Sequence, residues 1–268
     1  MRARMRTRKA VFLDIDGTLI IRDGFLFEED RKAMEEAAQK GHLLFLNTGR
    51  SFANIPPALI ELGFIRGIAA GGGSHILLAV SPPRTESRFQ TIYHKWFSED
   101  QLAKIFDWYG AHSRCCILEG ERDCYIINHS SLIFAEKVPV PLSSFDEFKR
   151  KSSGDFISKL TMDGFASEEE HSLLELFCRI NSFADYFEGI IKGESKAKAM
   201  EIILAKFGIE REDSIAIGDS VNDLDMIRFA GLGIAMGNAS AELKAAAGAV
   251  TGCCGKGGVA EALRKFAS

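Results

Sequence analysis

Four aspartates in two distant segments have the spacing of a metal and phosphate site. Asp14 and Asp16 come directly after one apolar run, and Asp219 and Asp223 follow a second apolar run much later in the chain. Carboxylates held close together repel each other unless a proton or a cation neutralises them. Their oxygens are ligands that Mg²⁺ prefers. We therefore expect these four aspartates to bind one Mg²⁺ ion, although aspartates at such positions can also cap turns and helices.

Other polar residues suit a phosphate group. Thr48 offers a hydroxyl and Gly49 a backbone N–H near a predicted helix start, and both can bind a phosphate oxygen. With them we take Arg50 and Asn222 as candidate substrate-binding residues. Lys196 lies in the first turn of a predicted helix, where the helix dipole disfavours a positive charge, so its presence there favours a bound anion. Ordinary helix capping and a solvated lysine are the structural alternatives.

Alternating strands and helices position these groups. Short apolar runs predict strands at residues 9–13, 42–47, 68–70, 214–217 and 232–235. Amphipathic or capped segments predict helices at residues 28–40, 51–62, 195–207, 222–229 and 259–266. This alternation is typical of a doubly wound, Rossmann-like parallel sheet with helices on both faces. Ligands of such sheets bind at the carboxyl ends of the strands, so Asp14, Asp16, Thr48 and Asp219 should meet there.

The middle of the chain has a different pattern, with a predicted hairpin between residues 76–80 and 89–96. Helices are expected at residues 99–109, 144–151 and 167–181, and strands at 115–118, 124–128, 156–162 and 183–187. Hairpins and paired helices indicate an α+β module inserted into the parallel sheet. We predict a discontinuous catalytic core at residues 1–81 and 188–268, and an inserted cap domain at residues 82–187.

These motifs resemble those of the haloacid dehalogenase superfamily, and most of all its Cof-type branch with a type IIB cap. The matching segments are Asp14-Ile15-Asp16-Gly17-Thr18, Thr48-Gly49-Arg50, Lys196 after Ser195, and Gly218-Asp219 with Asn222-Asp223. Each motif is short, but all of them occur in the family's order and spacing. The resemblance covers the predicted core, whereas the insertion matches only in its length and element pattern.

The resemblance implies roles for individual residues. Asp14 would attack phosphorus and form an aspartyl-phosphate, and Asp16 would act first as the acid and then as the base. Thr48 and Lys196 would hold the phosphoryl oxygens. Mg²⁺ would be bound by Asp14, the backbone carbonyl of Asp16, and Asp219, with Asn222 and Asp223 ordering the surrounding shell. Phosphoryl transfer depends mainly on in-line positioning and charge neutralisation, which such a site supplies.

Charge and composition limit the classes of binding partner that the chain is expected to have. The formal net charge is −4, so no global charge favours nucleic acid or a membrane surface. Six cysteines without a C-x-x-C pair favour reduced thiols and a cytoplasmic protein. The six histidines have no zinc-like spacing, so we expect no metal site from them.

The expected function is a Mg²⁺-dependent phosphohydrolase for small phosphomonoesters, as a monomer or homodimer. A sugar phosphate is the first candidate substrate, and a phosphorylated cofactor the second. Two alternatives stay open: a phosphomutase of the same superfamily, and an inactive phosphate-binding protein on the same scaffold. The cap would set specificity, with candidates among Arg114, Glu119, Arg122, Asp123 and Tyr125.

Overall fold

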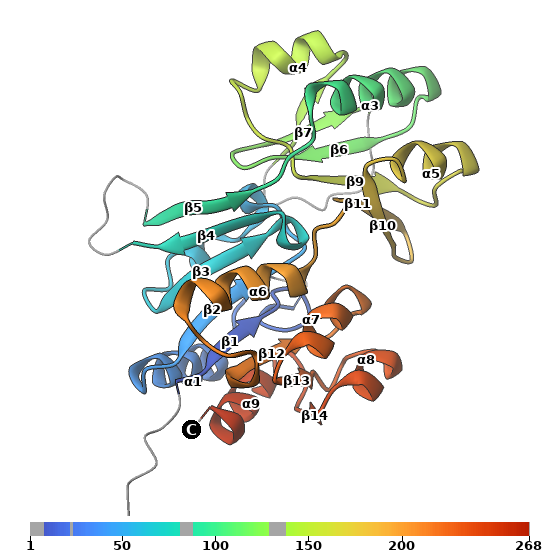
Figure 1. Cartoon of the computed structure of the whole chain (residues 1–268). Helices are drawn as coiled ribbons and strands as arrows, with labels where there is room; N and C mark the ends of the chain where they lie inside the picture. Colours follow the sequence, from blue (N-terminus) through green and yellow to red (C-terminus); the bar gives the residue numbers. More distant parts are fainter. Residues whose placement is uncertain (1–7, 22–23, 81–87, 129–137, 268) are drawn as a thin grey trace, which may run out of the picture.

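The computed structural model describes residues 8–21, 24–80, 88–128 and 138–267, and these form two sheets with helices around them (Figure 1). The larger sheet has the strand order β14 (Ala249–Val250), β13 (Leu232–Ala235), β12 (Ser214–Gly218), β1 (Ala10–Leu13), β2 (Leu43–Asn47), β3 (Ile65–Ala70), β4 (His75–Ala79) and β5 (Phe89–His94). Neighbouring strands from β14 to β3 are parallel, whereas β4 and β5 are antiparallel to their neighbours. The predicted doubly wound core is therefore confirmed.

The smaller sheet lies beyond the carboxyl ends of the parallel strands (Figure 1). Its strand order is β10 (Cys178–Ser182), β11 (Tyr186–Ile191), β9 (Lys159–Asp163), β6 (Cys116–Glu119), β7 (Cys124–Ile127) and β8 (Val140–Leu142). Among the described strands of this sheet, only β7 and β8 are paired in parallel. This α+β module is the predicted type of insertion.

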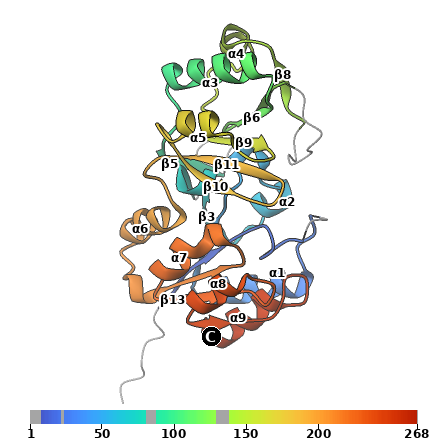
Figure 2. The ribbon, with the colours of Figure 1, turned by 90° about the vertical axis from the view of Figure 1, so that its right-hand side faces the viewer.

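Helices cover both faces of the larger sheet and one face of the smaller one. They are α1 (Glu28–Gln39), α2 (Pro57–Ile60), α3 (Glu99–His112), α4 (Phe145–Lys151), α5 (Glu168–Leu174), α6 (Lys196–Phe207), α7 (Leu224–Phe229), α8 (Ala241–Ala246) and α9 (Gly258–Phe266). Figure 2 shows α1 and α6 on opposite sides of the larger sheet. Among the described residues, no helix combines the length and the apolar composition that a membrane crossing requires.

The alternation of side chains along β1 explains how two helical layers cover one sheet. Val11 and Leu13 pack into the core that includes α1 and α9, whereas Ala10 and Phe12 pack into the core that includes α6 and α7. Successive side chains of a strand point to opposite faces, so a strand that is buried on both faces is apolar throughout. All four residues of β1 are fully buried.

The same alternation gives the smaller sheet two different faces. Leu160 and Met162 of β9 pack into the apolar core that includes α3, α4 and α5. Lys159 and Thr161 alternate with them, and their side chains therefore lie on the opposite face, toward the larger sheet. The buried Lys159 and Thr161 consequently mark the face of β9 that is turned toward the larger sheet.

Two element predictions are wrong. The helix expected at residues 167–181 ends with α5 at Leu174, and Cys178–Ser182 forms β10 instead, paired antiparallel with β11. The helix expected at residues 51–62 is replaced by a 3₁₀ turn at Phe52–Asn54 and the short α2, because Pro56 and Pro57 interrupt helical hydrogen bonding.

The predicted insertion boundaries do not coincide with the boundary between the sheets. β5 falls within residues 82–187, yet it pairs with β4 in the larger sheet. β11 begins inside that range and ends beyond it, in the smaller sheet. The turn of the predicted hairpin at residues 81–87 lies outside the described residues. We propose that the functional insertion starts after β5 and ends with β11.

Candidate active site

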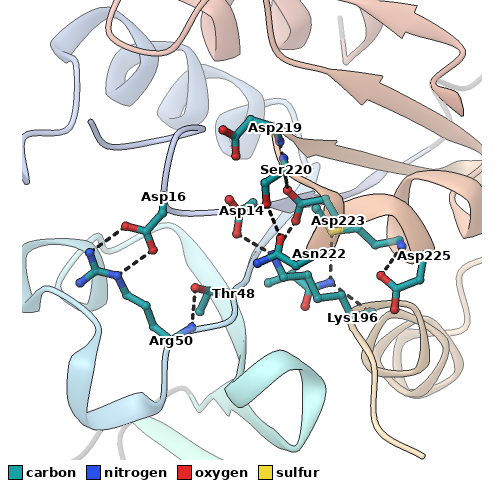
Figure 3. A network of polar contacts seen from close by, with 12 residues as sticks. Asp14, Asp16, Thr48, Arg50, Lys196, Asp219, Ser220, Asn222, Asp223 and Asp225 are labelled. Atoms are coloured by element: carbon teal, nitrogen blue, oxygen red, sulfur yellow. Dashed lines mark hydrogen bonds and ion pairs between the residues drawn. The ribbon is translucent and has the colours of Figure 1, made fainter. Parts of the chain in front are cut away.

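The carboxyl ends of two neighbouring strands bring the distant aspartates together. Asp14 directly follows β1 and Asp219 directly follows β12, and these strands are parallel with Leu13 opposite Ile217. The backbone N–H of Asp14 donates to the carbonyl of Ile217 at 3.0 Å, which continues the ladder to the edge of the sheet. Ligand atoms of Asp14, Asp219 and Asp223 lie within 4.8 Å of one another (Figure 3). The structure therefore gathers three of the four predicted metal ligands.

Gly17 allows this close approach. Its φ of +75° lies in the left-handed region, and a Cβ atom at this position would overlap the carboxylate of Asp219. The side-chain amide of Asn238 fastens the contact, because its Nδ2 donates to the Gly17 carbonyl at 2.8 Å and to Asp219 Oδ2 at 3.2 Å. Asn238 was not predicted as a site residue, although a Gly-Asn-Ala segment following a strand was visible in the sequence.

Lys196 lies at the centre of the cluster. Its Nζ donates to Asp14 Oδ1 at 2.7 Å and to Asp223 Oδ1 at 2.5 Å, and all three side chains are buried. Ser195 caps α6 by accepting the N–H of Lys198, which places Lys196 at the first helical position. Burial alone would lower the pKa of Lys196, but the two carboxylates outweigh burial and raise it, so the lysine is charged.

Burial raises the pKa values of two acidic groups in this cluster. Desolvation, with Asp223 next in size, raises the pKa of Asp14 well above its usual range, although Lys196 acts in the opposite direction. Desolvation and then Asp223 also raise the pKa of Asp219 to about 7. Both effects come from bringing negative charge into a poorly solvated space. Additional positive charge would relieve them.

A divalent cation fits this site. Asp219 Oδ1 is buried and has no hydrogen-bond partner among the described residues, so it is available as a ligand. Asp223 is less available: its Oδ2 accepts the backbone N–H groups of Asp219 and Ser220, both at 3.0 Å, and its Oδ1 accepts from Lys196. Asp223 therefore fixes the loop that carries Asp219, whereas Asp14 and Asp219 offer the oxygens.

Asp16 does not share the cluster in this structure. Its exposed carboxylate accepts two hydrogen bonds from Arg50, from Nε and Nη2, both at 2.8 Å (Figure 3). In this structure the pair with Arg50 holds the Asp16 side chain to one side of Asp14, Asp219 and Asp223, and the predicted metal-binding role of Asp16 stays a prediction. Arg50 also donates to the carbonyl of Asn54 at 2.8 Å.

The loop after β2 carries Thr48 and Gly49, the two residues predicted to bind phosphate. The backbone N–H of Thr48 donates to Ala69, and the buried Thr48 hydroxyl accepts the N–H of Arg50 at 3.0 Å. Gly49 lines the cavity beside Asn222, and a Cβ at Gly49 would lie 3.5 Å from Asn222 Nδ2. Ser220 Oγ donates to Asn222 Oδ1 at 2.7 Å and orients that amide.

A cavity of about 520 Å³ opens over these residues and is bordered on its other side by residues of β9, β11 and the turn before β11. Its walls include Asp14, Asp16, Gly49, Asp219 and Asn222 from one side and Lys159, Phe183, Tyr186 and Glu188 from the other. None of the five insertion residues suggested from sequence is among the described lining residues. The sequence could not tell which face of the inserted sheet looks toward the core.

The inserted face is polar. Lys159 Nζ lies 2.6 Å from Glu188 Oε1 and 3.2 Å from Glu119 Oε1, and all three side chains are buried. Burial alone would lower the pKa of Lys159, but the two glutamates outweigh it and raise it. Glu188 Oε2 is buried without a hydrogen-bond partner among the described residues, and it faces Gly49 across the cavity.

Glu119 joins the two sheets. Its Oε2 accepts hydrogen bonds from Ser51 Oγ at 3.0 Å and from Asn54 Nδ2 at 2.7 Å, both from the loop that follows β2. Its Oε1 accepts from Thr161 Oγ1 at 2.6 Å, within the smaller sheet. Burial alone would raise the pKa of Glu119, but Lys159 and these donors lower it. An ionised carboxylate thus fastens the insertion over the cavity.

Comparison with known proteins agrees with this arrangement. Residues 11–263 match the model of the haloacid dehalogenase-like hydrolases. The 5-amino-6-(5-phospho-D-ribitylamino)uracil phosphatase YcsE of Bacillus subtilis is 28% identical over 265 residues, covering 96% of this chain and 95% of that protein.

Two further proteins are similar. The phosphoglycolate phosphatase of Methanothermobacter thermautotrophicus is 49% identical over 72 residues, but these cover only 27% of this chain and 33% of that protein. A solved structure of a subclass IIB sugar phosphatase superposes with a TM-score of 0.79 at 28% identity, covering 96% of this chain and 98% of the other.

Proposed function

The chain belongs to the haloacid dehalogenase-like hydrolases, and from that premise we propose that it is a Mg²⁺-dependent phosphatase with Asp14 as its nucleophile. The supporting observation is the meeting of Asp14 and Asp219 at the carboxyl ends of β1 and β12, beside a buried lysine that pairs with Asp14 and Asp223. Relatives named as phosphatases across nearly the whole chain support the same reaction class.

Asp14 and Asp219 would hold the metal, with the backbone carbonyl of Asp16 added by family resemblance. Mg²⁺ fits an all-oxygen site that leaves room for water and phosphate, and when bound it neutralises charge on the phosphoryl group. Lys196 would also supply positive charge beside the phosphoryl group. Because its Nζ holds one oxygen of Asp14, it would also orient the Asp14 carboxylate for attack.

The chemistry follows from the two aspartates that lie two residues apart. Asp14 attacks phosphorus, the bond from phosphorus to the leaving oxygen breaks, and Asp16 gives that oxygen a proton. A water then attacks the aspartyl-phosphate while Asp16 takes up its proton, which releases inorganic phosphate and restores Asp14. Asp16 must leave Arg50 to do this. This movement breaks two hydrogen bonds of 2.8 Å to the Arg50 side chain, which is only 19% exposed.

The inserted face favours a substrate with several hydroxyl groups. Glu188 presents a free carboxylate oxygen that can accept a hydroxyl proton, and the neighbouring Lys159 can donate to an oxygen. By their names, one similar protein acts on 5-amino-6-(5-phospho-D-ribitylamino)uracil and another is a sugar phosphatase. We therefore place a small sugar or polyol phosphate first and phosphorylated cofactors second.

A screen of phosphomonoesters with Mg²⁺ tests this proposal. We expect phosphate release that stops with EDTA and that is lost in Asp14→Asn. The matched control is Asp213→Asn, an aspartate that pairs with Lys9 outside the cavity and should keep full activity. Activity that survives in Asp14→Asn would refute the nucleophile. Formation of an isomer instead of phosphate, on addition of a bisphosphorylated sugar, would identify a phosphomutase instead.

A further inference from the structure

A second group of ligand-type side chains lies away from the cavity, where the two sheets meet. His75 of β4 and His94 of β5 are opposite each other in the antiparallel pairing, and their rings stack with centroids 3.8 Å apart. Glu121, from the turn between β6 and β7 of the smaller sheet, places Oε2 3.9 Å from His94 Nδ1. Ligand atoms of the three residues lie within 4.8 Å of one another.

Buried nitrogen atoms without partners point to a ligand here. The His75 residue is 1% exposed and the His94 side chain 6%. His75 Nδ1 and His94 Nε2 have no hydrogen-bond partner among the described residues. The other nitrogen of His75 lies 2.9 Å from Thr91 Oγ1. His75 is thus oriented through Nε2 and left free at Nδ1, an arrangement common in metal ligands, whereas His94 has Nδ1 next to Glu121 and its other nitrogen without a partner in the described part of the chain.

The state of the rings agrees with this interpretation. Burial lowers the pKa of His75 to about 3 and that of His94 to about 4. Both imidazoles are therefore neutral near pH 7, and the neutral imidazole is the form that binds metals. Trp96 and Phe156 contact the His94 ring edge-on.

We propose that His75, His94 and Glu121 form a binding site for a divalent transition-metal ion, with zinc the best match to the donor set. Two imidazoles and one carboxylate are ligands that zinc accepts, and three protein ligands leave a position for water. The stacked rings direct their lone pairs into nearly parallel planes. Binding should therefore draw one ring out of the stack.

Such an ion would connect the two sheets. Two of its ligands belong to the larger sheet and the third to the turn of the smaller one. A bound ion would therefore restrain movement of the insertion relative to the core. This site shares no residue with the proposed phosphatase site, so the two proposals can fail separately.

Zinc binding is best measured in an Asp219→Asn background by isothermal titration calorimetry, with excess Mg²⁺ and a non-thiol reductant present. We expect one Zn²⁺ per chain. His94→Gln should weaken binding at least about tenfold. His171→Gln is the matched control, because His171 is an exposed histidine 3.6 Å from a glutamate, and it should bind as the parent does.

Two further measurements distinguish loss of the proposed site from a folding defect and from Zn²⁺ binding to cysteine thiols. Glu121→Gln changes a partly exposed turn residue and should also weaken Zn²⁺ binding while the circular dichroism spectrum stays native. Co²⁺ should give visible bands of nitrogen and oxygen ligation without the charge-transfer absorption of a thiolate. Unchanged Zn²⁺ affinity in both His94→Gln and Glu121→Gln, or a thiolate band with Co²⁺, would overturn the proposal.

Discussion

Replacing Lys196 by methionine should expose the electrostatic basis of the site. The two side chains have similar length, so packing is largely kept while the positive charge is removed from between Asp14 and Asp223. Breaking a buried ion pair in this way costs about 3–5 kcal/mol, because uncompensated charge is left in a poorly solvated place. For a chain of this size, each kcal/mol corresponds to roughly 2–4 °C in melting temperature. We therefore expect a fall on the order of 10 °C.

The assay is thermal unfolding of Lys196→Met beside Lys198→Met, each with and without Mg²⁺. Lys198 stands on the same helix and pairs with Glu194, but its side chain is 38% exposed, so its loss should cost less than about 1 kcal/mol. Mg²⁺ should recover part of the stability of Lys196→Met, and phosphatase turnover should fall about 10²–10³-fold. Equal losses of stability in the two variants would refute the reasoning.

Three further predictions concern the same cavity. Gly17→Ala should lower both stability and Mg²⁺ affinity, because alanine is strained at this positive φ and its Cβ would push Asp219 aside. Calorimetric titration with Mg²⁺ checks this prediction, and an affinity equal to that of the native protein would contradict it. The pKa of Asp219 in the folded chain is about 7, above its ordinary value of 3.8, so the folded chain binds this proton more tightly than the unfolded chain does. The stability of the metal-free protein should therefore fall as pH rises from about 4 to 7. Urea unfolding in EDTA should show this slope, and Asp219→Asn should reduce it. Glu119→Gln should loosen the insertion by weakening its bonds to Ser51 and Asn54, seen as faster hydrogen exchange in the loop after β2; unchanged exchange would argue against a fastening role.

The convergence of Asp14 and Asp219 was predictable because it depends on a rule of topology. Each aspartate follows an apolar strand, and parallel strands end at a common edge of the sheet. Predicting the strands from the sequence is therefore enough to place both residues at that edge. The direction in which each side chain points was less predictable. Asp16 turns to Arg50 in this structure, and nothing in the spacing of the two aspartates reveals that competing partner.

The insertion was harder to predict because its important contacts join strands that are distant in sequence. Lys159 and Glu188 meet only because β9 and β11 pair side by side, and their facing depends on strand register. The stretch that forms β10 was predicted as the end of a helix, because its apolar residues also fit helical spacing. His75 and His94 meet through the register of a hairpin, which the spacing of histidines does not show.

Mass spectrometry of Asp16→Asn, quenched in acid during a single turnover of p-nitrophenyl phosphate with Mg²⁺, tests the central claim most directly. The good leaving group needs no acid, while loss of the base should slow hydrolysis of the intermediate. We predict a burst of p-nitrophenol with a matching phosphoryl group on the peptide that contains Asp14. A burst with the phosphoryl group on another residue, or with no covalent phosphoryl group, would contradict the account.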